Sequence, residues 1–530
     1  GDADGDGIDD LVVPRYGEPN ALYRGEGDGR FIEATDESGL AEPVPEVAAG
    51  VTEQGSAAVA WADVDGDDDL DLFAGGLGAR PDQLWINDGN GVFAEEAFER
   101  GVSTVEPPGP NDGVSSEFAR ATMGAAFADW DRDGDVDLIT ARWGSGYLNP
   151  AVSSDGEKPT TCQLTRGKID IQNADDDRYA PSRLLANDGE GRFTDVTKES
   201  ALDLAPIAAF TPVFADYDDD GWLDLFLTGD FCSSRLFRNT QRGGFVNVTL
   251  EVGVGSDENG MGSAVEDLDA DGRLDWLVTS IGADEGGNGC ANSLTYIGCS
   301  GNRLYRGAAD GTFTDETDAY GLRRSGWGWG AIVEDLDNDG SRDVVAVNGY
   351  TDAGTYFQTA GPDEQAASAF FEQGATRLWQ GGSLPMSDVG ESAGLAVAGS
   401  AKSVLAADSD DDGDLDLITA DSGGVVRVFR NDSEQQGHWL GVRLHDPTSP
   451  NTGALGARIR LEVPDGNQQW IAEARSGGGY QSSGPGTQHF GLGDVDRVAA
   501  VEVRWPDSES YERFPVSSID QVLDIERNAS

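Results

Sequence analysis

Asp129-Trp-Asp131-Arg-Asp133-Gly134-Asp-Val-Asp137-Leu-Ile is the stretch of sequence that decides the fold. Carboxylates stand at positions 1, 3, 5 and 9 of this stretch, a glycine stands at position 6, and an apolar run follows. Residues at alternating positions can point inward where a chain curls around a small centre, and carboxylates gathered there repel one another unless a cation lies between them. The stretch therefore predicts a metal-binding loop that leads into a β-strand.

The same pattern occurs seven times, and every copy keeps Asp at positions 1, 3, 5 and 9. We number the copies loop one to loop seven. Six copies have glycine at position 6, where the chain must turn sharply, and loop two has Asp68, a residue type that also tolerates a left-handed conformation. The predicted metal ligands, loop by loop, are Asp2, Asp4, Asp6 and Asp10; Asp63, Asp65, Asp67 and Asp71; Asp129, Asp131, Asp133 and Asp137; Asp216, Asp218, Asp220 and Asp224; Asp267, Asp269, Asp271 and Asp275; Asp335, Asp337, Asp339 and Asp343; and Asp408, Asp410, Asp412 and Asp416.

Hard, charged oxygen ligands in a loop of this length favour Ca²⁺ over Mg²⁺, which keeps its waters in a strict octahedron. The sequence therefore predicts up to seven bound Ca²⁺ ions. An EF-hand is excluded, because it needs glutamate at position 12 and flanking helices, whereas Val13 and Thr140 stand there within β-type runs. Tandem calcium repeats of the dockerin type would lie closer together. A set of Asp-Gly turns that bind nothing stays open as the alternative.

The loops begin 61, 66, 87, 51, 68 and 73 residues apart, and repeats of this length with short strands are typical of a β-propeller. The sequence predicts an all-β, seven-bladed propeller over residues 1–433, with four strands in each repeat. In the third repeat these strands are 122–128, 136–141, 183–186 and 192–196. Small residues near the start of each first strand suit an innermost strand. The first repeat lacks this strand, so either the strand lies outside this sequence or another segment closes the ring.

In a propeller the first-to-second and third-to-fourth strand turns share one face, so the metal loops and the Asn/Gly hairpins should lie together. The long insertions 144–182, 282–302 and 350–376, and those at 41–55 and 100–120, would then lie on the opposite face. Long loops commonly carry function. The predicted ligand-binding residues of that face are Trp143, Tyr147, Arg178, Tyr179, Trp327, Trp329, Tyr350 and Tyr356. The alternative is that these side chains pack beneath their own loops.

Residues 434–530 carry no metal loop and predict a separate small β domain, called the C-terminal module here. Its expected strands are 438–445, 457–463, 470–474, 498–505 and 522–526. Between them stand Arg475-Ser-Gly-Gly-Gly479-Tyr480 and His489-Phe-Gly-Leu-Gly493. Such glycine runs either make tight corners or let the backbone approach an anionic ligand, and we expect corners.

The formal charge is −61 over 530 residues, which argues against binding of nucleic acid or anionic membranes. No segment is apolar enough for a membrane-spanning helix, so we expect no membrane insertion. Calcium sites of this kind suit a secreted or cell-surface protein. Four cysteines agree with that location: Cys290 could pair with Cys299 and Cys162 with Cys232, and four free thiols are the alternative.

The seven Asp loops resemble FG-GAP/VCBS repeats, as in the integrin α-subunit propeller. Gly456-Ala-Arg, the two glycine runs above and Arg504-Trp-Pro-Asp507 resemble an ASPIC/UnbV domain. Together these features are similar to the cartilage acidic protein family over nearly the whole chain. The resemblance implies a secreted, calcium-stabilised propeller with a small β domain and no established enzymatic activity, and it places ligands on the face away from the calcium loops.

The favoured function is therefore an extracellular calcium-binding module for adhesion or recognition of a protein or glycan, and we predict no enzyme. One alternative is a structural subunit of a filament or surface layer, because an open first repeat could take a strand from a neighbour. Another is a polysaccharide-active enzyme. Its chemistry needs a positioned acid/base set, but the only three histidines, His438, His445 and His489, all lie in the C-terminal module.

Overall fold

The computed structural model describes residues 1–15, 18–41, 55–77, 81–103, 121–143, 182–205, 207–282, 300–350, 371, 374–397, 399–433, 437–464, 468–484 and 486–528. Within these residues regular structure is almost entirely strand, and the two α-helices, α1 (Thr249–Val252) and α2 (Thr317–Tyr320), are one turn each. The predicted all-β fold is confirmed. In this part of the chain no helix has the length and apolar character needed to cross a membrane.

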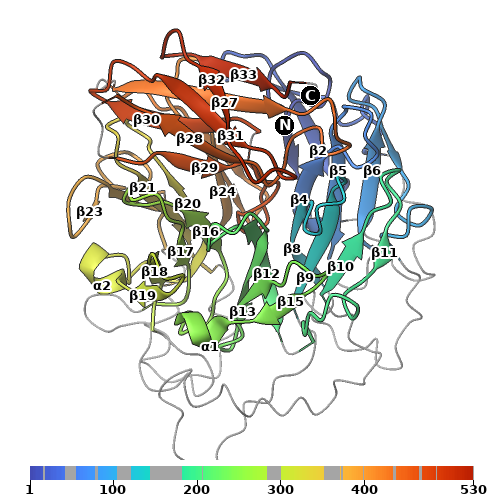
Figure 1. The fold of residues 1–530 in the computed structure, drawn as a ribbon, viewed down its shortest axis with the longest axis horizontal. Helices are drawn as coiled ribbons and strands as arrows, with labels where there is room; N and C mark the ends of the chain where they lie inside the picture. Colours follow the sequence, from blue (N-terminus) through green and yellow to red (C-terminus); the bar gives the residue numbers. More distant parts are fainter. Residues whose placement is uncertain are drawn as a thin grey trace, which may run out of the picture.

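Seven antiparallel sheets follow one another along the chain, and Figure 1 shows them succeeding one another in sequence colour from blue to orange. Sheet one contains β1 (Leu11–Val13), β2 (Ala21–Gly25) and β3 (Phe31–Glu33). Sheet two contains β4 (Ser56–Ala62), β5 (Asp71–Gly76), β6 (Gln83–Asn87) and β7 (Phe93–Glu95). Sheet three contains β8 (Ala121–Ala128), β9 (Asp137–Trp143), β10 (Arg183–Ala186) and β11 (Thr194–Asp195). Sheet four contains β12 (Ala208–Ala215), β13 (Asp224–Asp230), β14 (Arg235–Asn239) and β15 (Phe245–Asn247).

Sheet five contains β16 (Ser263–Glu266), β17 (Asp275–Val278), β18 (Arg303–Gly307) and β19 (Phe313–Asp315). Sheet six contains β20 (Gly328–Glu334), β21 (Asp343–Asn348), β22 (Arg377–Gln380) and β23 (Ser387–Asp388). Sheet seven contains β24 (Ala401–Ala407), β25 (Asp416–Asp421) and β26 (Val426–Phe429). Sheet one has three described strands, as expected for a repeat without its innermost strand, and the prediction of a fourth strand is wrong for sheet seven, which also has three described strands. Sheet one has no strand before its loop, and after β26 the chain passes into the C-terminal module.

The first strands of neighbouring sheets pack side by side from β4 through β8, β12, β16 and β20 to β24. Small residues are required where they meet. A Cβ atom on Gly124 would lie 2.1 Å from the carbonyl oxygen of Phe210, and one on Gly262 would lie 2.2 Å from that of Trp329. The close approach explains why a small residue is found there in the repeats that have this strand. A closed ring of seven blades stays a prediction.

The C-terminal module consists of two sheets around their own apolar core. One has the order β30 (Gln488–Gly493), β27 (His438–His445), β33 (Val522–Glu526), with β27 and β33 parallel; the other has the order β29 (Ile471–Glu473), β28 (Arg458–Glu462), β31 (Ala500–Arg504), β32 (Glu512–Pro515). The sequence analysis did not predict β30 or β32. It missed β30 because that strand includes a Gly-Leu-Gly run, which we interpreted as a corner. The predicted domain boundary at 433/434 adjoins residues outside the described part and stays a prediction.

The module lies against the face of the sheets that carries the predicted metal loops. Contacts reach loops two to seven. For example, Thr452 Oγ1 donates to Asp63 Oδ2 at 2.8 Å, Ser449 Oγ donates to the Gly134 carbonyl at 2.8 Å, and Gln469 N–H donates to the Ala270 carbonyl at 3.0 Å. Further along, His489 Nε2 lies 2.7 Å from Asn338 Oδ1 in loop six. The module thus covers the loop face, which its sequence did not suggest.

Residues 476–482 of the module extend between the innermost strands. Ser476 Oγ donates to the Trp61 carbonyl at 2.6 Å, and Ser482 Oγ donates to the Val404 carbonyl at 3.3 Å. Tyr480 is 1% exposed, and its ring centroid lies 5.7 Å from that of Phe210 and 5.4 Å from that of Trp329. Both partners stand six residues before their loops, so Tyr480 reaches toward the far ends of the innermost strands. The glycine run is a corner, as expected. It also places Tyr480 between the innermost strands, and we call residues 476–482 the plug.

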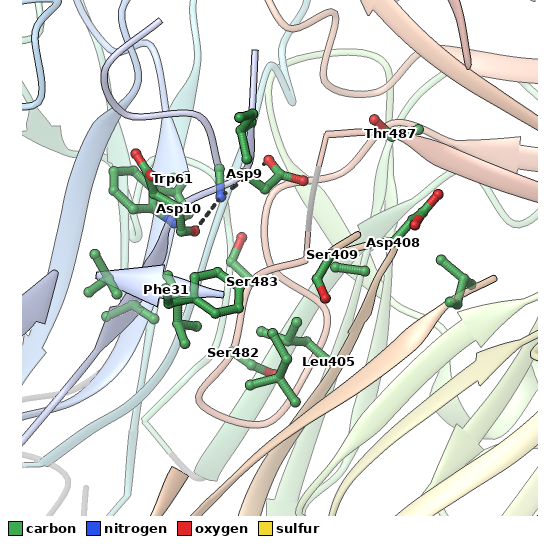
Figure 2. A pocket seen from close by; sticks show the side chains of 18 of the residues that line it. Asp9, Asp10, Phe31, Trp61, Leu405, Asp408, Ser409, Ser482, Ser483 and Thr487 are labelled. Atoms are coloured by element: carbon green, nitrogen blue, oxygen red, sulfur yellow. Dashed lines mark hydrogen bonds and ion pairs between the residues drawn. The ribbon is translucent and has the colours of Figure 1, made fainter. Parts of the chain in front are cut away.

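A cavity of about 130 Å³ lies between sheet one, sheet seven and the module (Figure 2). The main-chain groups of Gly1 and Asp10 exchange two hydrogen bonds, which corresponds to the pairing of Ala62 with Asp71 in sheet two. Gly1 therefore stands where the last residue of an innermost strand stands elsewhere. The cavity wall includes Asp9 and Phe31 of sheet one, Leu405, Asp408 and Ser409 of sheet seven, Trp61 of sheet two, and Ser482, Ser483 and Thr487 of the module.

We expect Tyr480→Ala to lower the free energy of unfolding by about 3–5 kcal/mol, the usual cost of removing a buried aromatic side chain. Chemical denaturation followed by tryptophan fluorescence measures the change, since Trp329 lies beside the ring. Tyr511→Ala is the control, because that ring is half-buried and packs on Arg460 at the module surface. A loss below about 1 kcal/mol at Tyr480, an ordinary surface effect, would contradict the plug.

Candidate metal centres

The aspartate at position 1 shapes each loop by accepting hydrogen bonds from the loop backbone. In loop three, Asp129 Oδ1 accepts from the N–H of Asp133 at 3.1 Å and Oδ2 accepts from the N–H of Gly134 at 3.2 Å. The same two bonds recur in all seven loops. The chain turns at position 6 with a left-handed φ, including φ 78° at Asp68, as expected for that Asp.

The aspartate at position 9 joins the loop to the hairpin of the same sheet. In loop three, Asp137 Oδ1 accepts from the N–H of Asn187 at 2.9 Å. An equivalent bond to the hairpin residue occurs in the other six sheets. The metal loops and the hairpins therefore lie on one face, which confirms the arrangement expected from strand order.

The aspartate at position 3 is left with an unpaired oxygen. In six loops its Oδ1 atom is buried and, in the described structure, has no hydrogen-bond partner; these residues are Asp4, Asp65, Asp131, Asp218, Asp337 and Asp410. A buried carboxylate oxygen without a partner costs free energy unless something else binds it. The same atom is unsatisfied at the same place in six loops, so the pattern fits a ligand that is not part of the chain.

Carboxylates of each loop gather closely enough to share one ion. In loop three, single oxygens of Asp129, Asp131 and Asp137 lie within 4.8 Å of one another. The described residues contain seven groups of this kind, and loops one to five each supply one of them. Oxygen-only, anionic sites of this kind suit a hard divalent cation. The clusters could therefore hold metal ions, and the residues present fit Ca²⁺.

The raised pKa values of the loop aspartates also favour a bound cation. Burial, with repulsion from Asp133 and Asp131, raises the pKa of Asp129 to about 7. Burial also raises the pKa of Asp71 to about 8 and that of Asp335 to about 7. Carboxylates are held in these positions against both desolvation and mutual repulsion. A bound cation would offset both and restore the charged form.

The predicted ligand-binding residues of the opposite face are only partly described. Tyr147, Arg178, Tyr179 and Tyr356 lie outside the described residues. Trp327 and Trp329 are 7% and 8% exposed, and Trp143 and Tyr350 are half-buried. The four described aromatic residues pack on the apolar cluster between the innermost strands, together with Phe371 and Tyr480.

Three of these rings form a stack. The Trp327 centroid lies 4.5 Å from that of Tyr350 and 6.2 Å from that of Trp329, with nearly parallel planes. Lys402 Nζ lies 3.6 Å from the Trp329 centroid and donates to the Gly349 carbonyl. Packing thus accounts for much of the surface of these side chains, and their role in ligand binding stays a prediction.

Sequence reasoning missed the residues that the module places on the loops. Arg504 pairs with Asp216 and Asp219 of loop four, and Trp439 lies against Gly413 of loop seven. No local pattern marks them, because they act only through contacts with residues more than 20 positions away. Cys232 is disulfide-bonded, and the other three cysteines lie outside the described residues, so the predicted pairing is untested.

Two protein-family models match this chain, one over repeats that contain metal loops and one over the C-terminal module. An FG-GAP-like repeat model matches residues 2–74, 63–140, 216–278 and 293–346. An ASPIC and UnbV model matches residues 447–530. The chain combines FG-GAP-like repeats with an ASPIC and UnbV domain. The resemblance predicted from the sequence is confirmed.

Relatives and solved structures add to this at low identity. Cartilage acidic protein 1 of Xenopus tropicalis is 24% identical over 99% of this chain and 72% of its own length, and that of Mus musculus is 23% identical over 99% and 72%. An Agrocybe aegerita lectin that recognises non-reducing terminal N-acetylglucosamine is 15% identical, covers 84% of this chain and 94% of its own, and superposes with a TM-score of 0.39. At that TM-score the lectin supports no functional inference.

We expect Asp131→Asn to lower Tm in excess Ca²⁺ but not in the presence of a chelator. The amide keeps the size of the side chain and removes one charged ligand; losing a site at a hundredfold excess of ion over its Kd costs about 2.7 kcal/mol. In chelator the substitution relieves repulsion with Asp129 and Asp133, so Tm should stay or rise. Differential scanning calorimetry in both conditions measures the two shifts.

Asp310→Asn is the matched control, because this carboxylate is exposed in the sheet-five hairpin and bonds only to Thr312 nearby. Its Tm should move equally in calcium and in chelator. An equal loss of Tm in both conditions for Asp131→Asn would mean that Asp131 is not a metal ligand.

Proposed function

We propose that this chain is an extracellular, calcium-stabilised binding module that recognises a protein or a glycan on the face opposite its metal loops. The observation that carries the proposal is the recurrence of a buried, unpaired carboxylate oxygen at position 3 of six loops on one face. Calcium there would be structural, since it fixes the corner between the first two strands of a sheet. It is not proposed to react with a substrate.

We place the ligand on the face opposite the metal loops because the C-terminal module lies against the loops. The C-terminal module contacts loops two to seven, and residues 476–482 occupy the space between the innermost strands from that side. The opposite face carries the ends of β9, β17 and β21, where the insertions 144–182, 282–302 and 350–376 begin. Aromatic side chains with an occasional arginine are typical of surfaces that bind sugars or proteins.

An extracellular location is proposed on three grounds. Calcium loops of this kind suit the calcium concentration outside cells. The disulfide at Cys232 suits an oxidising compartment. The chain is also similar to cartilage acidic protein 1, which agrees with the secreted location that the family resemblance implies.

Recognition is favoured over catalysis because the three histidines are engaged in the module. His438 lies 2.9 Å from Asp520, His489 lies 2.7 Å from Asn338, and His445 lies 3.4 Å from Asp68. All three lie in the module or at its contact with the loops. We therefore propose no enzymatic activity.

Self-association is the second candidate, and it rests on β1. Within the described residues β1 pairs only with β2, and Leu11, Val12 and Val13 of β1 line the cavity of Figure 2. A free strand edge can accept a strand from another chain. This candidate predicts oligomers that form as concentration rises, which the recognition proposal does not require.

We expect the calcium-loaded chain to bind one class of glycan or extracellular-matrix protein on an array, and Trp143→Ala to weaken that binding at least tenfold. Trp143 stands at the end of β9 where the longest insertion begins, and it donates to Asp230 at 2.8 Å. Tyr511→Ala, a half-buried aromatic residue of the module, is the control and should bind as the unaltered chain does.

Sedimentation of the same samples separates the two candidates. A monomer that binds an array ligand supports recognition. A chain that binds nothing on the array and forms oligomers with concentration would replace the recognition proposal with self-association.

A further inference from the structure

Arginines contact carboxylates of several loops, but in the described structure only in loop five does one arginine contact three of the four predicted metal ligands. Arg306, in β18, places Nη1 2.7 Å from Asp275 Oδ2 and Nη2 3.3 Å from Asp271 Oδ2. Nη2 also bonds to Asp269. These carboxylates are positions 3, 5 and 9 of the loop. A single guanidinium thus contacts three of the four residues that would bind the ion.

In three other loops of the described structure the residue at the position equivalent to Arg306 contacts the cluster only through the outer oxygen, Oδ2, of the position-3 aspartate. Arg24 Nε lies 3.3 Å from Asp4 Oδ2, Arg430 Nη1 lies 3.5 Å from Asp410 Oδ2, and Gln380 Nε2 donates to Asp337 Oδ2 at 2.8 Å. In each case the donor takes Oδ2, and Oδ1 remains buried and unpaired. These neighbours therefore orient the position-3 carboxylate and leave its inner oxygen available to a cation.

The exposed fractions of the side chains also separate loop five from loops one and seven. The side chain of Arg306 is 9% exposed, whereas those of Arg24 and Arg430 are 35% and 55% exposed. The position-3 aspartate of loop five, Asp269, is 38% exposed, whereas Asp4 is 17% and Asp410 is 10% exposed. Asp269 is also the one position-3 aspartate whose Oδ1 is not among the buried unpaired oxygens of the described residues.

Local packing holds Arg306 in this place. Its guanidinium lies over the ring of Tyr320 in α2, 5.6 Å from the ring centroid. Arg273, at position 7 of loop five, also pairs with Asp271. Two guanidinium groups are therefore bonded to the carboxylates of this one loop.

We propose that the guanidinium of Arg306 takes the place of the metal ion in loop five, so that this loop binds no Ca²⁺ and the chain binds six ions instead of seven. This inference rests on the proposed calcium function of the other loops. A fixed positive charge at hydrogen-bonding distance from three ligands offsets their repulsion as an ion would. It also repels a second cation and occupies the ligand oxygens.

Loop five would consequently keep its carboxylates together whether or not calcium is present. Arginine keeps its charge at any pH a protein meets, so the contact cannot be removed by deprotonation.

The test counts calcium ions per chain in the unaltered protein and in Arg306→Gln, by equilibrium dialysis against saturating Ca²⁺ and atomic emission. Gln380 holds the equivalent place in loop six, so Arg306→Gln gives loop five the arrangement of a loop with a free inner oxygen. We expect six ions in the unaltered chain and seven in Arg306→Gln. Arg430→Gln, the same change at the equivalent place in loop seven, is the control and should leave the count unchanged.

Seven ions in the unaltered chain, or no gain in a folded Arg306→Gln chain, would overturn the proposal. If Arg306→Gln does not fold, the count in the unaltered chain decides between six and seven. A count of zero in the unaltered chain would overturn the calcium proposal itself, and this inference with it, so the two failures are distinguishable.

Discussion

Mutual repulsion of carboxylates at the loop corners is the constraint on which this structure depends. Loops one to five each bring single oxygens of three acidic side chains within 4.8 Å of one another. Backbone N–H groups satisfy the oxygens at position 1, and the hairpin satisfies one oxygen at position 9. In six loops the inner oxygen at position 3 is buried and has no hydrogen-bond partner in the described structure. We propose that a cation completes each of these six corners and that in loop five the Arg306 guanidinium supplies the positive charge.

The corners also form the surface on which the C-terminal module lies. The module contacts loops two to seven through Thr452, Ser449, Gln469, His489 and other residues. The loops that hold the carboxylate clusters therefore also form part of this interface. Because Tyr480 passes from the module to the far ends of the innermost strands, the interface continues into the centre of the fold. Packing of the sheets and docking of the module therefore share residues, and the opposite face is the one that we propose for recognition.

Local chemistry in the sequence predicted the features that local chemistry controls. Asp at alternate positions with Gly134 or Asp68 at the turn predicted the loop geometry, and strand order predicted that loops and hairpins share a face. The sequence could not place Tyr480 or Arg504, because their roles arise from contacts with residues far away along the chain. It also treated loop five as equivalent to the others, since Arg306 stands 31 residues after Asp275 and enters the cluster only once sheet five has formed. The burial of Trp327 and Trp329 was open for the same reason.

The most direct measurement is anomalous X-ray scattering from crystals of the whole chain grown with calcium, collected at a wavelength where calcium scatters strongly. The account predicts an anomalous peak among the carboxylates of loops one, two, three, four, six and seven, each within bonding distance of the position-3 Oδ1 atom. It predicts no peak in loop five, where the Arg306 guanidinium should be seen. Loops that keep their carboxylates together with no ion between them would contradict the central claim.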